Sequence, residues 1–203
     1  MNPDFAGSHY NLGVTLKELG KLNEAELSFR HAIALKPGYV EAHNNLGITY
    51  QELGKLDEAE SSYRQAIALK PDYAEAHYNL GITLQELGRY VEAEVNFRQV
   101  VALKPDYAEA QSNLANILLE LGRYDEAEVN YRQAIALKPD YAEAHYNLAV
   151  TLKELGNLDE AESSYRQAIA LKPDYVEAHS NLGNIFLELG RYDEAEVNYR
   201  QAI

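Results

Sequence analysis

The apolar residues of this chain recur with helical spacing, in paired stripes separated by a glycine. In one stretch the first stripe consists of Ala76, Leu80, Leu84 and Leu87, and Gly88 interrupts it. The second stripe consists of Tyr90, Ala93, Phe97, Val100, Val101 and Leu103, and Pro105 ends it. Residues spaced in this way lie on one face of a helix. Two helices joined by so short a turn pack antiparallel, so the stretch is predicted to be a helical hairpin.

The predicted helices are preceded by an aspartate that has a glutamate three residues later. Asp72 and Glu75 precede one first helix, and Asp57 and Glu60 precede one second helix. This is the spacing of the capping box, in which a side-chain oxygen accepts a bond from a backbone N–H at the start of the helix. We therefore expect these aspartates to cap the helices.

The hairpin pattern returns every 34 residues. The stretches 40–73 and 142–175 differ at seven positions, so 27 of 34 residues are identical. A fixed period of this length indicates a solenoid, in which each unit buries its apolar face against its neighbours. The predicted units are the tail of an earlier repeat at 1–5, five full repeats at 6–39, 40–73, 74–107, 108–141 and 142–175, and an incomplete repeat at 176–203. We expect the chain to be a piece of a longer array.

Small and aromatic residues form columns with the same period. One small column is Ala25, Ala59, Ala93, Ala127, Ala161 and Ala195, and the other is Gly13, Gly47, Gly81, Ala115, Ala149 and Gly183. The aromatic column is Phe29, Tyr63, Phe97, Tyr131, Tyr165 and Tyr199. Small side chains let helices approach to about 8 Å, and the aromatic rings are predicted to fill the space between hairpins. The alternative is that the rings stack on a ligand.

These columns resemble those of the tetratricopeptide repeat family over essentially the whole chain. The match rests on Leu80-Gly81, Gly88, Tyr90, Ala93, Phe97 and Pro105 and their copies. The resemblance implies an all-α fold: a right-handed α-solenoid (superhelix) of antiparallel helix-turn-helix hairpins, with the first helix of each hairpin on the concave wall. The chain departs from the family where a large aromatic is common; there it carries His9, His43, His77, Gln111, His145 and His179.

An unbroken column of asparagines lies in the middle of the first helices: Asn11, Asn45, Asn79, Asn113, Asn147 and Asn181. Asparagine is a mediocre helix former, so propensity does not explain the column. The position faces the groove in the family, and the superhelical domain of O-linked N-acetylglucosamine transferase is similar, with an asparagine ladder that grips the backbone of an extended peptide. A carboxamide both donates and accepts, so it can pair with any peptide unit. We predict peptide contact; the alternative is a structural bond to a neighbouring helix, and the two are compatible.

Acidic residues are expected to line the same groove. They form a column near the ends of the first helices: Glu18, Glu52, Glu86, Glu120, Glu154 and Glu188. Family members that clamp an acidic peptide terminus use basic groove residues, and the sequence has no such basic cluster. The expected partner is therefore an extended polypeptide segment that is basic or neutral. Variable positions, among them Tyr78 and Tyr146, are expected to supply selectivity.

Composition argues against several classes of protein. The net charge is −14 and the pI about 4.8, whereas nucleic-acid phosphates and anionic membrane surfaces attract basic proteins. There is no cysteine, so neither a disulfide nor thiolate chemistry is available. The sequence shows no apolar run of membrane-spanning length and no signal-peptide pattern at its start, so we expect a cytoplasmic protein.

No catalytic or metal site is expected. Five of the six histidines lie in one column and are a repeat apart, which separates equivalent atoms by about 10 Å or more. A zinc ligand must lie within about 2.0–2.2 Å of the metal. The acidic residues recur in every repeat, whereas a catalytic pair is a singular arrangement. We predict no enzyme activity, no cofactor and no metal.

These observations favour a protein–protein interaction scaffold that binds an extended polypeptide segment along its groove. One alternative is a structural solenoid that self-associates end to end. Another is the tetratricopeptide arm of a larger enzyme, such as a glycosyltransferase, and a third is a consensus-derived chain without an evolved ligand.

Overall fold

In the computed structural model, residues 5–203 are described and contain twelve α-helices. They form two compact units, Met1–Pro105 and Asp106–Ile203. Unit 1 contains α1 (Ala6–Glu18), α2 (Leu22–Leu35), α3 (Val40–Glu52), α4 (Leu56–Leu69), α5 (Ala74–Glu86) and α6 (Tyr90–Leu103). Unit 2 contains α7 (Ala108–Glu120), α8 (Tyr124–Leu137), α9 (Ala142–Glu154), α10 (Leu158–Leu171), α11 (Val176–Glu188) and α12 (Tyr192–Gln201). The predicted all-α class is confirmed, and none of these helices is long and apolar enough to cross a membrane.

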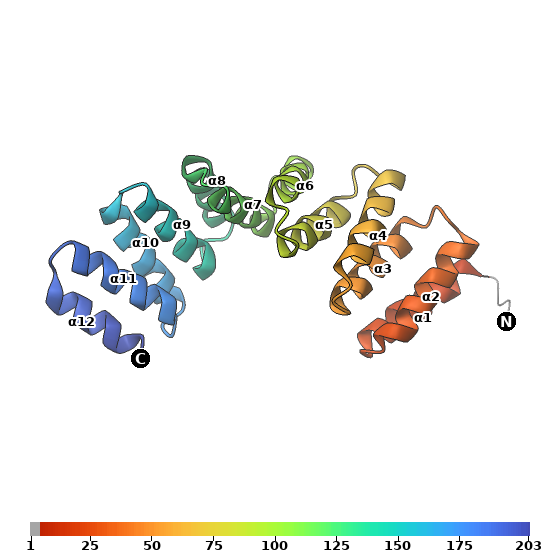
Figure 1. The fold of residues 1–203 in the computed structure, drawn as a ribbon, viewed down its shortest axis with the longest axis horizontal. Coiled ribbons are helices and arrows are strands. Elements are labelled where there is room, and N and C mark those ends of the chain that lie inside the picture. The colour runs from red at the N-terminus through yellow and green to blue at the C-terminus, as the bar shows by residue number, and fades with distance from the viewer. Residues whose placement is uncertain (1–4) are drawn as a thin grey trace. The chain divides into compact units, whose positions relative to one another are not determined.

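Consecutive helices pack against each other within each unit (Figure 1). The hairpins are α1–α2, α3–α4 and α5–α6 in unit 1, and α7–α8, α9–α10 and α11–α12 in unit 2. Each second helix also packs on the first helix of the next hairpin of its unit, as α2 does on α3 and α8 on α9. The predicted helix-turn-helix hairpins are therefore confirmed. The predicted division into repeats remains a prediction, and its first segment, 1–5, lies outside the described residues apart from Phe5.

The turn inside each hairpin closes on a glycine with a left-handed backbone. Gly88 has φ 71°, its N–H donates to the Gln85 carbonyl at 2.9 Å, and the Arg89 N–H donates to the Leu84 carbonyl at 2.8 Å. This pair of bonds is the Schellman motif, which satisfies carbonyls at the end of the helix. Only glycine adopts this backbone conformation without cost, so the glycine sets the place of the turn.

The predicted aspartate caps are wrong. The residue that caps α5 is Tyr73, the one that caps α4 is Lys55, and in none of the twelve described helices does the capping side chain bond to the backbone. Asp72 therefore stands before the cap, and Asp57 stands inside the first turn. An acidic residue in the first turn still stabilises the helix, because it faces the positive end of the helix dipole.

The core of each hairpin is an aromatic ring of the second helix that lies against a small residue of the first. Phe97 is fully buried, and a Cβ atom added to Gly81 would lie 2.8 Å from its ring. Tyr63 is also fully buried and lies in the same way against Gly47. Five members of the aromatic column are thus core, as predicted, and their burial leaves no face for ligand stacking, whereas Tyr199 is half-buried. Members of the column pack against the small residue of their own first helix, and Phe29 also forms a buried cluster with Leu46 of the next hairpin.

Ion pairs join one hairpin to the next within each unit. Glu60 on α4, whose side chain is 14% exposed, accepts from Arg89 at the start of the next second helix at 2.6 Å. It also accepts from Arg64 at 2.9 Å, the pair expected from their spacing on one helix. Glu162 pairs with Arg191 in the same way in unit 2, at 2.6 Å. Each of these carboxylates pairs with two arginines, and such a network contributes more than an isolated surface ion pair.

Replacing Ala93 with Leu is expected to lower the free energy of unfolding by about 1–3 kcal/mol, because the larger side chain overpacks the interior. Ala93 is fully buried. Urea denaturation measures the change. The matched control is Val95→Leu two residues on, where the side chain is 65% exposed and the change should stay within about 0.5 kcal/mol. An Ala93→Leu protein as stable as the parent would contradict the close packing of the hairpin.

Candidate functional site

The asparagine column lies on the first helices of both units, and in each unit we call the surface that carries it the first-helix face. Unit 1 contributes Asn11, Asn45 and Asn79 from α1, α3 and α5, and unit 2 contributes Asn113, Asn147 and Asn181 from α7, α9 and α11. Asn11 is exposed and the other five are half-buried. A half-buried carboxamide can bond to the protein on one side and to another molecule on the other.

In unit 1 the column bonds to the preceding first helix. The Nδ2 atom of Asn45 donates to the Tyr10 hydroxyl at 3.0 Å and to the Glu41 carbonyl at 3.0 Å. The Nδ2 atom of Asn79 donates to Oδ1 of Asn44 at 3.3 Å. These bonds join α3 to α1 and α5 to α3. Some of the side-chain N–H donors of the asparagines therefore stabilise the packing of the helices.

In unit 2 the same role involves a second asparagine. The Nδ2 atom of Asn147 donates to Oδ1 of Asn116 at 3.1 Å, which also accepts from the Tyr131 hydroxyl at 2.6 Å. The Nδ2 atom of Asn116 lies 3.5 Å from Oδ1 of Asn113. Asn116 therefore holds three side chains in place. The sequence did not single it out for this, although it stands where four first helices carry valine or isoleucine and only α11 also has an asparagine, Asn184.

The column keeps hydrogen-bonding capacity that these contacts do not use. A carboxamide offers two N–H donors and an oxygen with two lone pairs. Within the described part of the chain, the Oδ1 atoms of Asn45, Asn79 and Asn147 accept no hydrogen bond. One N–H of Asn79 and one of Asn147 are also unused. These atoms can pair with the N–H and C=O groups of another chain.

Tyr146 and Tyr78 lie beside the column and are held by aromatic neighbours. The Tyr146 hydroxyl accepts from Nδ2 of Asn181 at 3.0 Å, and its ring centroid is 4.9 Å from that of Tyr175. Lys172 lies over the Tyr175 ring, with Nζ 4.6 Å from the centroid. The Tyr78 ring lies 5.9 Å from Phe97. Tyr175, in the turn before α11, was not predicted as part of the site. The pattern that could have revealed it is the tyrosine that precedes five of the six first helices.

The tyrosine cluster of unit 2 disfavours ionised phenols. Burial, with the charges of Tyr146, Glu143 and Glu177, raises the pKa of Tyr175 to about 12. Burial and the charge of Glu177 also raise the pKa of Tyr146. Both hydroxyls therefore remain available as hydrogen-bond donors and acceptors throughout the physiological range.

All members of the predicted acidic column are exposed. Lysines partly neutralise some of these glutamates, and the others have no ion-pair partner among the described residues. Nζ of Lys17 lies 3.3 Å from the Glu18 carboxylate and 4.0 Å from that of Glu52, and Lys153 lies 3.2 Å from Glu188. In unit 1, Glu86 accepts only from Nε2 of Gln51, at 3.1 Å. In unit 2, Glu120 and Glu154 have no ion-pair partner among the described residues. Charge that can attract a basic partner therefore remains at Glu86, Glu120 and Glu154.

The histidine column has a structural use that the sequence did not indicate. Nε2 of His43 lies 2.9 Å from the Pro37 carbonyl, and Nε2 of His145 lies 3.0 Å from the Pro139 carbonyl. Each histidine thus fastens the loop that leads into its own hairpin. Residues 5–203 contain no group of three or more side chains placed to hold a metal ion.

The comparisons with known proteins agree with the fold. The family model named Cilia and flagella-associated protein 70 C-terminal domain matches residues 8–203. The chain belongs to this tetratricopeptide repeat family. None of the curated protein sequences matches it.

Solved tetratricopeptide proteins share the architecture. MamA is 27% identical with a TM-score of 0.75, over 77% of this chain and 92% of that chain. YrrB, described as a TPR protein with an unusual peptide-binding site, is 24% identical with a TM-score of 0.79, over 87% and 91%. A tetratricopeptide repeat protein from Parabacteroides merdae is 21% identical with a TM-score of 0.82, over 95% and 77%.

The raised pKa of Tyr175 predicts a loss of stability of this tetratricopeptide protein in alkali. The folded state holds the phenolic proton more tightly than the unfolded chain, whose pKa is about 10. The contribution is therefore complete below about pH 10 and is lost as the pH rises through about 12. Urea denaturation between these pH values should show that the free energy of unfolding falls less steeply with pH for Tyr175→Phe than for the parent. The control is Tyr192→Phe, an exposed tyrosine; equal slopes for parent and Tyr175→Phe would contradict the prediction.

Proposed function

We propose that this tetratricopeptide chain is a protein–protein interaction scaffold that binds an extended, basic or neutral polypeptide segment on its first-helix face. The observation that supports this best is the unused Oδ1 atom on each of Asn45, Asn79 and Asn147. A half-buried acceptor without a partner is satisfied by water or by a ligand, and every main-chain N–H of an extended polypeptide is a donor that can pair with it.

Binding proceeds through main-chain amides of the partner. Its N–H groups donate to the Oδ1 atoms of the column, and its carbonyls accept from the unused N–H groups of Asn79 and Asn147. Because every residue carries the same main chain, such contacts tolerate sequence variation. The asparagine ladder of O-linked N-acetylglucosamine transferase, which the column resembles, uses the same chemistry, and the description of YrrB supports peptide binding as a use of the fold.

Side chains beside the column supply selectivity in this proposal. Glu86 in unit 1, with Glu120 and Glu154 in unit 2, attracts lysine or arginine of the partner, and Glu52 contributes less because Lys17 lies near it. Tyr78 and Tyr146 offer ring edges and a hydroxyl to flanking side chains. The net charge of −14 adds long-range attraction for a basic partner.

The proposed scaffold works without catalysis, cofactor or metal. We place it in the cytoplasm; the matching family carries the name of a protein of cilia and flagella, so imaging of a tagged chain in a ciliated cell tests whether it shares that location. Attachment to an enzyme such as a glycosyltransferase would make it a targeting arm, with the same binding face.

A peptide-display selection tests the proposal. Peptides enriched by the parent are measured against a variant with Asn45, Asn79, Asn113 and Asn147 changed to Ala. Binding should fall at least about tenfold, since one net hydrogen bond contributes about 1 kcal/mol and several are removed. It should also weaken with salt. The matched control changes Asn96 and Asn130 on the second helices to Ala, and circular dichroism establishes that each variant is folded.

Equal binding by the folded variant and the parent would show that the column is purely structural. A failure to enrich any peptide, together with a mass in light scattering that rises with concentration, would instead support end-to-end self-association. In that case a polar helix added at one end should restore a constant mass.

A further inference from the structure

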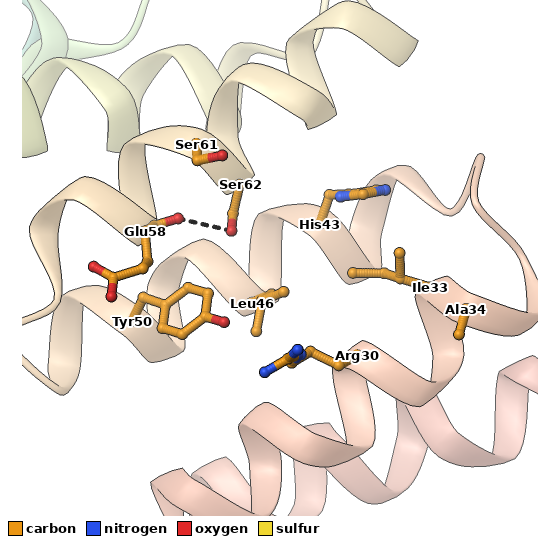
Figure 2. A pocket seen from close by; sticks show the side chains of 9 residues that line it. All are labelled: Arg30, Ile33, Ala34, His43, Leu46, Tyr50, Glu58, Ser61 and Ser62. Atoms are coloured by element: carbon orange, nitrogen blue, oxygen red, sulfur yellow. Dashed lines mark hydrogen bonds between the residues drawn. The ribbon is translucent and has the colours of Figure 1, made fainter.

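A pocket of about 440 Å³ lies between α2, α3 and α4 in unit 1 (Figure 2). From α3 it is lined by His43, Leu46 and Tyr50, which share a helix face different from that of Asn45. A second pocket of about 350 Å³ lies between α8, α9 and α10 in unit 2. Both volumes fall in the range of ligand-binding pockets.

The two pockets correspond residue by residue, three repeats apart. The first is lined by Ile33, His43, Leu46, Ser61 and Ser62, and the second by Ile135, His145, Leu148, Ser163 and Ser164. Paired serines at these positions occur only in α4 and α10.

Three other second helices, α6, α8 and α12, place an asparagine where the second serine of each pair stands, while α2 carries Ser28 there. On α6, Oδ1 of Asn96 lies 3.0 Å from Nδ1 of His77. On α12, Oδ1 of Asn198 lies 3.4 Å from Nδ1 of His179. In those hairpins the chain's own carboxamide satisfies the histidine. The change from asparagine to the shorter serine removes that group and opens the space beside the ring.

His43 and His145 are held with one ring nitrogen toward these pockets. A carbonyl only accepts, so Nε2 of each ring carries the hydrogen that bonds to Pro37 or Pro139. Nδ1 of each ring has no hydrogen-bond partner within the described chain. The rings are therefore fixed in orientation and one polar atom of each is free to meet an occupant.

The charges around the pockets favour a neutral occupant. Arg30 and Glu58 both line the first pocket, so an anion meets Glu58 and a cation meets Arg30. In the second pocket Arg132 is already paired with Glu160 at 2.6 Å. Ile33 and Leu46, with their counterparts, offer apolar contact to an aliphatic stem. A neutral polar group on a short stem fits this lining.

We propose that each pocket binds the carboxamide side chain of an asparagine or glutamine from a partner polypeptide. The carboxamide takes the place that Asn96 holds beside His77, next to Nδ1 of His43 or His145. Because it donates and accepts, it also bonds to the serine hydroxyls, while its stem lies on the isoleucine and leucine. The site is independent of the first-helix face and does not rest on the function proposed for that face.

Histidine ring signals in NMR spectra of the full chain test the proposal. The probe is the peptide acetyl-Ala-Gln-Ala-amide, compared with the same peptide carrying Glu, Lys or Met in place of Gln. The glutamine peptide should shift the signals of His43 and His145 saturably, and the other three should bind at least fivefold more weakly. His77 and His179, which already have a carboxamide partner, should not respond.

Two double substitutions exchange the local sequences that the chain itself uses. Ser61→Val with Ser62→Asn should abolish the response of His43 and leave that of His145, while Val95→Ser with Asn96→Ser should create a response at His77. Both pairs occur naturally at these positions, so folding is retained, and thermal melting verifies it. The absence of a saturable shift would overturn the proposal, and so would a stronger response to the Glu or Lys peptide. A response of His43 that persists in the variant with Ser61→Val and Ser62→Asn would also overturn it.

Discussion

The contact on which the structure depends is the aromatic ring of each second helix against the small residue of its own first helix. Phe97 covers Gly81 so closely that an added Cβ atom would meet the ring at 2.8 Å. This approach fixes the separation and the rotation of the two helices, because a well-packed interior leaves little freedom for either. The hairpin is therefore the rigid element, and the neighbouring hairpins of a unit are positioned by polar contacts and by apolar contacts such as that of Leu46 with the Phe29 cluster.

The hairpins were predictable because their signals are local. Apolar spacing and the glycine of the turn act within one repeat, and the helices and turns that they predict are confirmed. The capping prediction failed for a local reason too: the helix begins one residue later than Asp72 requires, with Tyr73 at the cap. The serine pairs of α4 and α10 were also visible in the sequence, but their consequence depends on a histidine in another helix.

The contacts between hairpins could not be predicted from the sequence. The bond from Asn45 to Tyr10 and the pair of Glu60 with Arg89 depend on how far one hairpin is rotated and shifted against the next. No residue spacing within a repeat encodes that offset. The sequence therefore left the roles of the asparagines open. The structure shows that Asn45, Asn79 and Asn147 each bond to a neighbouring helix and keep an Oδ1 atom without a hydrogen bond among the described residues.

The bonds between hairpins have a consequence for how such a chain changes in evolution. Asn45 bonds to a residue 35 positions earlier and Glu60 to one 29 positions later. Because each contact joins neighbouring repeats, a duplicated repeat brings one partner of most of these contacts with it, and the repeats that flank a deleted one can form them with each other; Asn157, which stands in place of Arg89 in the fifth repeat, is an exception. The array can thus be lengthened or shortened by whole repeats without the invention of a new interface. A gain or loss of any other length breaks each of these junctions at once.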